Sequence, residues 1–164
     1  MKPLAESKAI DKLAVIRDGF RENISSYEKR AAPCASCKSP GACCLDEHFV
    51  NVRITKLEAV AIRKEIEKLS EEQQAKVAAR IAALQDHLLA EKYACPLFER
   101  GIGCLVHDTA KPLPCIAHAC YERKEDLPPD EILAKREIEI ERLNRGVYGR
   151  TTLLPIPMAL RRSL

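Results

Sequence analysis

Cysteine is the residue type in this sequence with the clearest capacity for chemistry. Eight cysteines occur in 164 residues, in two groups that a long cysteine-free stretch separates. The first group is Cys34, Cys37, Cys43 and Cys44, and the second is Cys95, Cys104, Cys115 and Cys120. Clustered thiolates are the ligands that zinc and iron–sulfur centres prefer. The pattern therefore predicts metal ligation, with a redox switch or ordinary buried thiols as the alternatives.

The first residues of the chain show no apolar segment of the kind that directs secretion. Thiols in such a chain are expected to meet a reducing compartment, where disulfides rarely persist. No apolar run approaches the roughly 20 residues that a membrane-spanning helix needs. The sequence therefore predicts a cytoplasmic protein with no membrane partner, whose cysteines are available as metal ligands.

The first group contains two distinct spacings. Cys34 and Cys37 form a CxxC knuckle, in which two thiolates can converge on one ion. Cys43 and Cys44 are adjacent, and the side chains of neighbouring residues point in different directions in both strands and helices. We therefore expect one of this pair to join the knuckle, while the other faces a second centre or stays a nearby thiol. At least one centre is then expected to draw ligands from both groups.

Four helices are predicted from the spacing of apolar residues and from capping residues, over 6–29, 56–69, 71–92 and 130–144. Thr55 with Glu58, and Ser70 with Gln73, match the capping box, in which a hydroxyl and a side-chain carbonyl or carboxylate satisfy the first amides of a helix. The second and third helices are expected to form a hairpin. Pro129 favours the start of the last helix, and Gly146 its end.

Shorter elements are predicted around the cysteines. Residues 49–54 alternate in polarity and favour a short strand, and Gly101 and Gly103 favour a tight loop or small hairpin between Cys95 and Cys104. The spacing from Cys115 to Cys120 suits one or two turns of helix. The first helix is expected to break near Gly19, and the tail with two prolines beyond Tyr148 to be extended.

The predicted fold class is mainly α, with a helical hairpin and terminal helices around irregular metal-binding cysteine loops and at most a short strand or hairpin. The length suits a single domain over residues 1–164. Within it, 1–33 is the N-terminal helical segment, 34–120 the metal-binding core, and 121–164 the C-terminal helix and tail.

The ordered cysteines and their neighbouring prolines resemble a known family. The CxxC motif, the adjacent pair, Cys95-Pro-Leu-Phe, Cys104-Leu-Val-His and Lys-Pro-x-x-Cys115 are similar to the YkgJ-type cysteine cluster family, whose consensus is CxxCxxCC. The resemblance covers Cys34 to Cys120 and implies a domain that chelates zinc or iron. Three positions depart from it: the gap before the adjacent pair is longer, His107 replaces a tyrosine, and Lys111 replaces an arginine.

The histidines are weaker candidates. His118 lies between two cysteines and could replace a thiolate in a site of three cysteines and one histidine. His48 and His107 flank cysteine motifs and could ligate or hydrogen-bond to a ligand, although packing or surface roles are the simpler interpretation. His87 is expected to be part of the exposed face of a helix.

Three functional classes follow from these residues. The first is a non-catalytic metal-binding module for zinc or iron, with a protein partner still to be identified. The second is a redox or catalytic iron–sulfur protein, because flagellin lysine methylases have a similar cysteine pattern. The third is nucleic-acid binding through zinc, which sparse aromatics and a near-zero charge after ligation disfavour, although the formal charge is +3. No residue set for hydrolysis or phosphoryl transfer is present.

Overall fold

The computed structural model describes residues 4–31, 52–84, 93–118, 121 and 123–161. Within these ranges the chain is mainly helical, as predicted, and contains two short antiparallel strand pairs. Several residues of the predicted site lie outside the described ranges: Cys34, Cys37, Cys43, Cys44, Cys120 and His48, as does His87.

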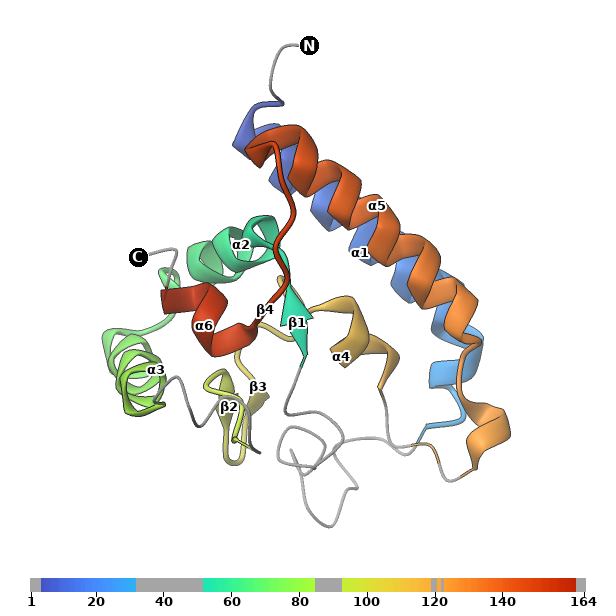
Figure 1. The fold of residues 1–164 in the computed structure, drawn as a ribbon. Helices are drawn as coiled ribbons and strands as arrows, with labels where there is room; N and C mark the ends of the chain where they lie inside the picture. The colour runs from blue at the N-terminus through green and yellow to red at the C-terminus, as the bar shows by residue number, and fades with distance from the viewer. Residues whose placement is uncertain (1–3, 32–51, 85–92, 119–120, 122, 162–164) are drawn as a thin grey trace.

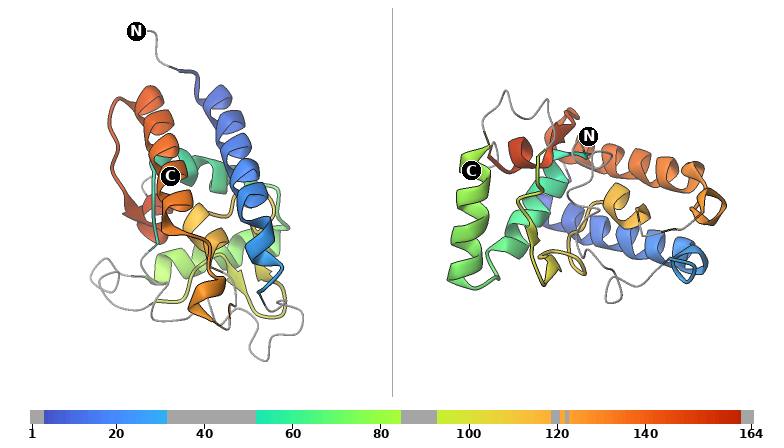
Figure 2. Two further views of the ribbon diagram at one scale, coloured as in Figure 1. Left: turned by 90° about the vertical axis from the view of Figure 1, so that its right-hand side faces the viewer. Right: turned by 90° about the horizontal axis from the view of Figure 1, so that it is seen from below.

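Two long helices form one side of the molecule. Helix α1 (Glu6–Glu28) and helix α5 (Asp130–Tyr148) run antiparallel and side by side in both views of the ribbon (Figures 1 and 2). The expected break in α1 at Gly19 is wrong, because the helix is continuous there. A Cβ at Gly19 would lie 3.5 Å from the guanidinium of Arg136 on α5, so the glycine lies where the two helices pass each other.

Helix α5 is longer than the sequence predicts. The expected stop at Gly146 is wrong, and the helix continues to Tyr148. Gly149 is the residue that ends it: its φ of 75° is in the left-handed region, and its amide donates to the carbonyl of Arg145 at 2.8 Å. Glycine adopts this conformation without the steric cost that a Cβ would add, which is why it is frequent after the last helical turn.

Both predicted capping boxes are confirmed. Thr55 precedes α2 (Lys56–Ile66), and Ser70 precedes α3 (Glu71–Ala83), each with reciprocal bonds to the third helical residue. At α2 the amide of Glu58 donates to the Thr55 hydroxyl at 3.2 Å, and the Thr55 amide donates to the Glu58 carboxylate at 2.8 Å. Helix α3 ends earlier than predicted, because Leu84 is already extended.

The C-terminal part contains a helix that the sequence does not predict. Strand β1 (Arg53–Ile54) pairs antiparallel with β4 (Leu154–Pro155), and helix α6 (Ile156–Arg161) follows directly. The expectation of an extended tail is therefore wrong over these residues. Pro157 is the second residue of α6, where an amide has no partner within the helix in any case, so proline is tolerated there.

The remaining elements surround the second cysteine group. Strands β2 (Phe98–Glu99) and β3 (Gly103–Cys104) form the predicted hairpin, helix α4 (Leu113–Ala117) follows, and a 3-10 turn, η4 (Lys124–Asp126), leads into α5. In Figure 1 the hairpin lies at the lower end of the molecule, and α4 lies between it and the α1–α5 pair.

The two larger apolar clusters of the described residues meet at α2. One cluster joins α2 and α3 to the β2–β3 region and α6, and Ile62, Val77, Leu97 and Leu160 belong to it. The other cluster joins α1, α2, α4 and α5. Helices α2 and α3 therefore share a core with α6, and α6 packs against both. The close packing of α2 and α3 on each other that a helical hairpin predicts is not observed, since each packs mainly against other elements, α6 among them.

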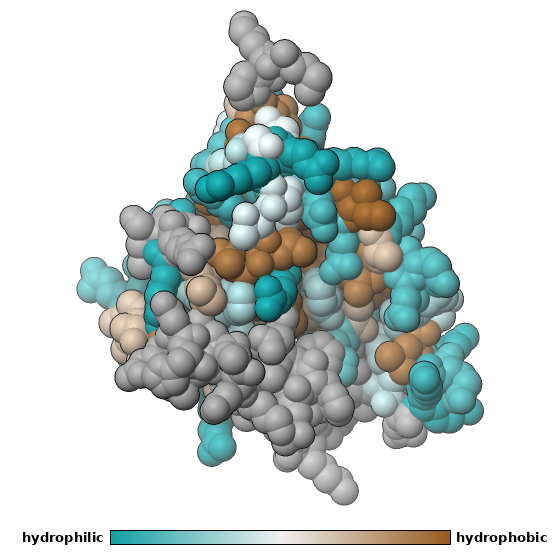
Figure 3. Space-filling view, in the orientation of Figure 1, coloured by the Kyte–Doolittle hydropathy of each residue, from teal (hydrophilic) through white to brown (hydrophobic). Residues whose placement is uncertain are grey.

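On the face of the molecule where α5 lies in front, hydrophilic side chains predominate and are interrupted by separate hydrophobic patches (Figure 3). Ile138 on α5 and Leu127 before it are two of the exposed large apolar residues. Isolated apolar side chains of this kind are ordinary on protein surfaces and do not indicate a docking face.

Asn144 is the polar residue that joins the N-terminal end of α2 to the C-terminal end of α5. Its side chain is 1% exposed. The Oδ1 atom accepts from the amide of Leu57 at 3.0 Å, and Nδ2 donates to the carbonyl of Arg150 at 3.0 Å and to the Thr151 hydroxyl at 3.3 Å. These three hydrogen bonds connect α2 and the segment after α5 to one side chain. Removal of the Asn144 side chain would therefore leave the Leu57 amide and the Arg150 carbonyl without these partners.

We expect Asn144→Ala to lower the free energy of unfolding by about 2 to 4 kcal/mol, because it leaves buried donors and acceptors without partners. Urea unfolding followed by circular dichroism measures the change. Asn23→Ala, at an exposed position of α1, is the matched control. Equal unfolding midpoints for the two variants would show that the Asn144 bonds contribute little.

Candidate metal centre

Cys95 is placed by the loop that enters the β2–β3 hairpin. The backbone amides of Leu97 and Phe98 donate hydrogen bonds to its sulfur, which favours the thiolate. The Phe98 amide also lies 3.0 Å from the Cys95 carbonyl, so the loop turns tightly around the cysteine. Amide donors aimed at a sulfur orient it and stabilise its negative charge, as they do around ligating thiolates.

The hairpin returns Cys104 toward Cys95. Phe98 pairs with Cys104 across the two strands, and the connection contains Gly101 and Gly103, with φ values of 85° and 100°. Both are in the left-handed region that favours glycine. The two flanking apolar residues, Leu97 and Val106, are 1% and 0% exposed and fix the hairpin to the core. The buried side chains of Leu97 and Val106 therefore position the partly exposed thiols of Cys95 and Cys104.

Cys115 comes from a different part of the core. Helix α4 starts after Pro112, and Leu113 and Ile116 are buried against α1 and α5. Cys115 lies between these two residues in sequence and remains only partly buried. The hairpin belongs to one apolar cluster and α4 to the other, and Cys115 lies near enough to Cys95 and Cys104 for their charges to affect its pKa.

The three thiols influence one another electrostatically. Burial raises the pKa of Cys95 to about 12, and a thiolate at Cys104 raises that pKa further. Burial also raises the pKa of Cys115 well above its ordinary value, and thiolates at Cys95 and Cys104 add to this increase. The ammonium of Lys111 acts in the opposite direction on both. Neutral thiols are thus favoured in the absence of a cation, and a bound cation would lower these pKa values.

The described residues do not complete a metal site by themselves. No three histidine, cysteine, aspartate or glutamate side chains among residues 4–31, 52–84, 93–118, 121 and 123–161 form a group that could hold an ion. Cys95 and Cys115 are free thiols. The structure therefore brings three of the eight predicted ligands into one region, and the other five lie outside the described ranges.

His107 is held beside this region by cations. The guanidinium of Arg21 donates to its backbone carbonyl, and the Lys111 ammonium lies 3.4 Å from Nδ1 of its ring. Burial, Lys111 and Arg21 lower the pKa of His107, so the neutral imidazole is favoured. His118 follows α4 and lines a separate apolar pocket with Phe20 and Leu133.

The structure adds supporting residues that the sequence does not reveal. Arg80 of α3 donates to the carbonyl of Phe98 at 2.7 Å and to that of Pro96 at 3.3 Å. Lys76, one turn earlier, forms an ion pair with Glu99 at 3.1 Å. The spacing of Lys76 and Arg80 places them on one face of α3, but a sequence cannot show that this face meets the hairpin.

Glu58 is an ionisable group between α2 and the start of α4. Burial raises its pKa from the ordinary 4.5 to about 7, while hydrogen bonds from Thr55 and the charge of Arg17 oppose this rise. The folded state therefore holds the proton more tightly than the unfolded state. The stability that this group contributes is complete below pH 4.5 and is lost as the pH rises through about 7.

We expect Glu58→Gln to become more stable relative to the wild type as the pH rises from 5 to 8, by about 2 to 3 kcal/mol. Glutamine keeps a carbonyl for the capping box, so the variant isolates the charge. Urea unfolding at each pH measures the difference in unfolding free energy between the variant and the wild type. Both proteins contain the same thiols, so thiol titration does not contribute to this difference. Glu67→Gln, at the exposed end of α2, is the matched control. A constant difference between Glu58→Gln and wild type would contradict the prediction.

Comparison of the chain with family models, curated proteins and solved structures found no match. Among the described helices, none combines the length and the apolar character needed to cross a membrane. The cysteine arrangement and its surroundings are therefore the basis for any functional conclusion.

Proposed function

We propose that this protein binds metal through its clustered cysteines, as zinc or as an iron–sulfur centre. The observation that supports the proposal best is the gathering of Cys95, Cys104 and Cys115 from two core clusters, with mutual effects on their pKa values. A bound cation would offset the mutual repulsion of these groups as thiolates. The resemblance to the YkgJ-type cysteine cluster family supports the same function.

The proposed ligands are the eight cysteines, of which Cys34, Cys37, Cys43, Cys44 and Cys120 would complete the set begun by Cys95, Cys104 and Cys115. A bound metal supplies a cross-link between chain segments, and an iron–sulfur centre would also carry electrons. Within the described residues, the amides of Leu97 and Phe98 orient Cys95, and Lys111 offsets the negative charge of the thiolates. No catalytic residue is proposed.

The proposed setting is the cytoplasm. A reducing compartment keeps thiols available as metal ligands, because disulfides rarely persist there. A metal that orders the cysteine segments would also fix the shape of the protein surface that they form. We propose that a protein partner binds this surface.

Metal content of cysteine variants tests the proposal. We expect Cys95→Ser and Cys115→Ser each to lose at least about half of the zinc or iron found in the wild type, because a hydroxyl is a poor substitute for a thiolate. Ala117→Ser places a hydroxyl on the same helix as Cys115 and retains every thiol, so it is the matched control. Wild-type metal content in both cysteine variants would contradict the assignment of these ligands.

A further inference from the structure

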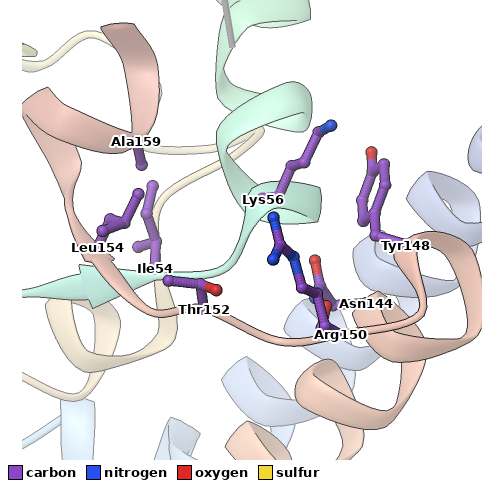
Figure 4. Close-up of a pocket in the computed structure, with 8 residues that line it drawn as sticks. All are labelled: Ile54, Lys56, Asn144, Tyr148, Arg150, Thr152, Leu154 and Ala159. Carbon is purple, nitrogen blue, oxygen red and sulfur yellow. The ribbon is translucent and has the colours of Figure 1, made fainter. Parts of the chain in front are cut away.

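A second candidate site lies away from the cysteines, between the start of α2, the end of α5 and the segment that leads into β4 (Figure 4). It is a pocket of about 290 Å³. Its lining includes none of the three described cysteines. The lining residues are Ile54, Lys56, Asn144, Tyr148, Arg150, Thr152, Leu154 and Ala159.

Local sequence features explain why the pocket exists. Gly149 ends α5 and reverses the chain, and the pairing of β4 with β1 carries residues 150–153 past the start of α2. Asn144 lines this pocket and connects its two sides through hydrogen bonds to the backbone of Leu57 and Arg150. The polar atoms of Asn144 are therefore engaged within the protein, and the charged groups of Lys56 and Arg150 are the ones that a ligand could contact.

The charge of the pocket is positive. Lys56 and Arg150 line it, and none of its eight lining residues is acidic. The Lys56 ammonium lies 4.5 Å from the centre of the Tyr148 ring, and neither cation forms an ion pair with another described residue. The nearby carboxylate of Glu6 accepts a hydrogen bond from the Tyr148 hydroxyl at 2.6 Å.

The rest of the lining is apolar. Ile54, Leu154 and Ala159 form one side, and the Thr152 hydroxyl lies between them and the cations (Figure 4). A volume of about 290 Å³ is near the lower end of the range for small-molecule sites. Cations on one side and apolar surface on the other match a small molecule with an anionic head and an apolar body.

We propose that this pocket binds a small organic phosphate, with the phosphate between Lys56 and Arg150 and the apolar part against Ile54 and Leu154. Two cations suit the double negative charge of a phosphate monoester better than the single charge of a carboxylate. This site is independent of the proposed metal centre.

Phenyl phosphate is the probe that tests the proposal. Inorganic phosphate tests the anionic group alone, and benzyl alcohol tests the apolar group alone. Titration of the full-length protein is followed by amide chemical shifts in NMR spectra. We expect phenyl phosphate to bind with shifts confined to the lining residues, inorganic phosphate to bind more weakly, and benzyl alcohol not to bind. Lys56→Gln and Arg150→Gln should each weaken phenyl phosphate at least about tenfold, because each removes a charge that contacts the phosphate.

Control variants separate binding from folding. Lys64→Gln on α2 and Arg142→Gln on α5 remove equal charges at exposed positions outside the pocket and should leave the affinity unchanged. Thr152→Phe keeps both cations and obstructs the exposed side of the pocket, so it should also abolish binding. Absence of phenyl phosphate binding to the wild type would overturn the proposal. Undiminished affinity in Lys56→Gln and Arg150→Gln would overturn it as well, since these cations would then serve only to stabilise the end of α5.

Discussion

Removal of the metal is expected to disorder the β2–β3 hairpin and α4 while α1 and α5 stay folded. A structural zinc contributes on the order of 10 kcal/mol of folding free energy. Buried apolar anchors are few in these segments: Leu97 and Val106 hold the hairpin, and Leu113 and Ile116 hold α4. We expect amide exchange across residues 95–118 to accelerate at least about a hundredfold without metal, since ligation supplies much of their order.

The α1–α5 pair is the internal reference for this experiment. Phe20 and Ile24 of α1 are fully buried in a cluster that includes residues of α2, α4 and α5, and the contacts with α2 and α5 require no ligand. Their amides should therefore keep most of their protection, and much of the helical circular dichroism should persist. A chelator already saturated with zinc is the control for non-specific effects. Equal protection of residues 95–118 with and without metal would contradict the prediction.

Loss of one ligand from the first cysteine group is expected to loosen the second group as well. We expect Cys37→Ser to accelerate amide exchange around Cys104 and Cys115, because at least one centre is predicted to take ligands from both groups. The prediction follows from the adjacent pair Cys43 and Cys44, whose side chains point in different directions and so favour different ions.

Ser36→Ala is the matched control, since it changes the neighbouring residue and keeps all eight thiols. Exchange and metal content are measured on the same anaerobic samples. If Cys37→Ser loses one metal while residues 95–118 keep their full protection, the two groups bind independently, and the prediction of shared ligands is wrong.

Sequence reasoning was most successful where structure depends on neighbouring residues. The capping boxes at Thr55 and Ser70 are local exchanges of hydrogen bonds, and both helices begin where these residues predict. The hairpin between Cys95 and Cys104 is similarly local, because Gly101 and Gly103 supply its left-handed conformations. The gathering of these two cysteines could therefore be predicted.

The predictions for the end of α5 and for the C-terminal tail are wrong because contacts between distant segments determine the structure there. Gly146 was expected to end α5, but Val147 and Tyr148 continue the helix because they pack with the α1 cluster. Helix α6 has Pro157 as its second residue and follows Pro155 of β4, and it forms because Leu160 and Ala159 are buried against α2 and α3. Contacts of this kind override local preference.

The same limit applies to the candidate site. The cysteines are visible in the sequence, but Arg80 reaches the hairpin carbonyls from a helix that precedes them along the chain. Lys111 could be noted only as a departure from a family pattern, whereas the structure shows its charge acting on both Cys95 and Cys115. Long-range charge effects of this kind depend on the folded arrangement and not on spacing.

The metal and sulfide content of protein purified without oxygen tests the central claim most directly. A colourless protein with zinc would indicate structural sites. A brown protein that absorbs broadly in the visible range, with about four iron and four sulfide per chain, would indicate an iron–sulfur cluster. The proposal predicts one of these two results, with the metal lost in Cys95→Ser. A chain that contains neither metal, and in which all eight thiols react with a thiol reagent in the native state, would contradict it.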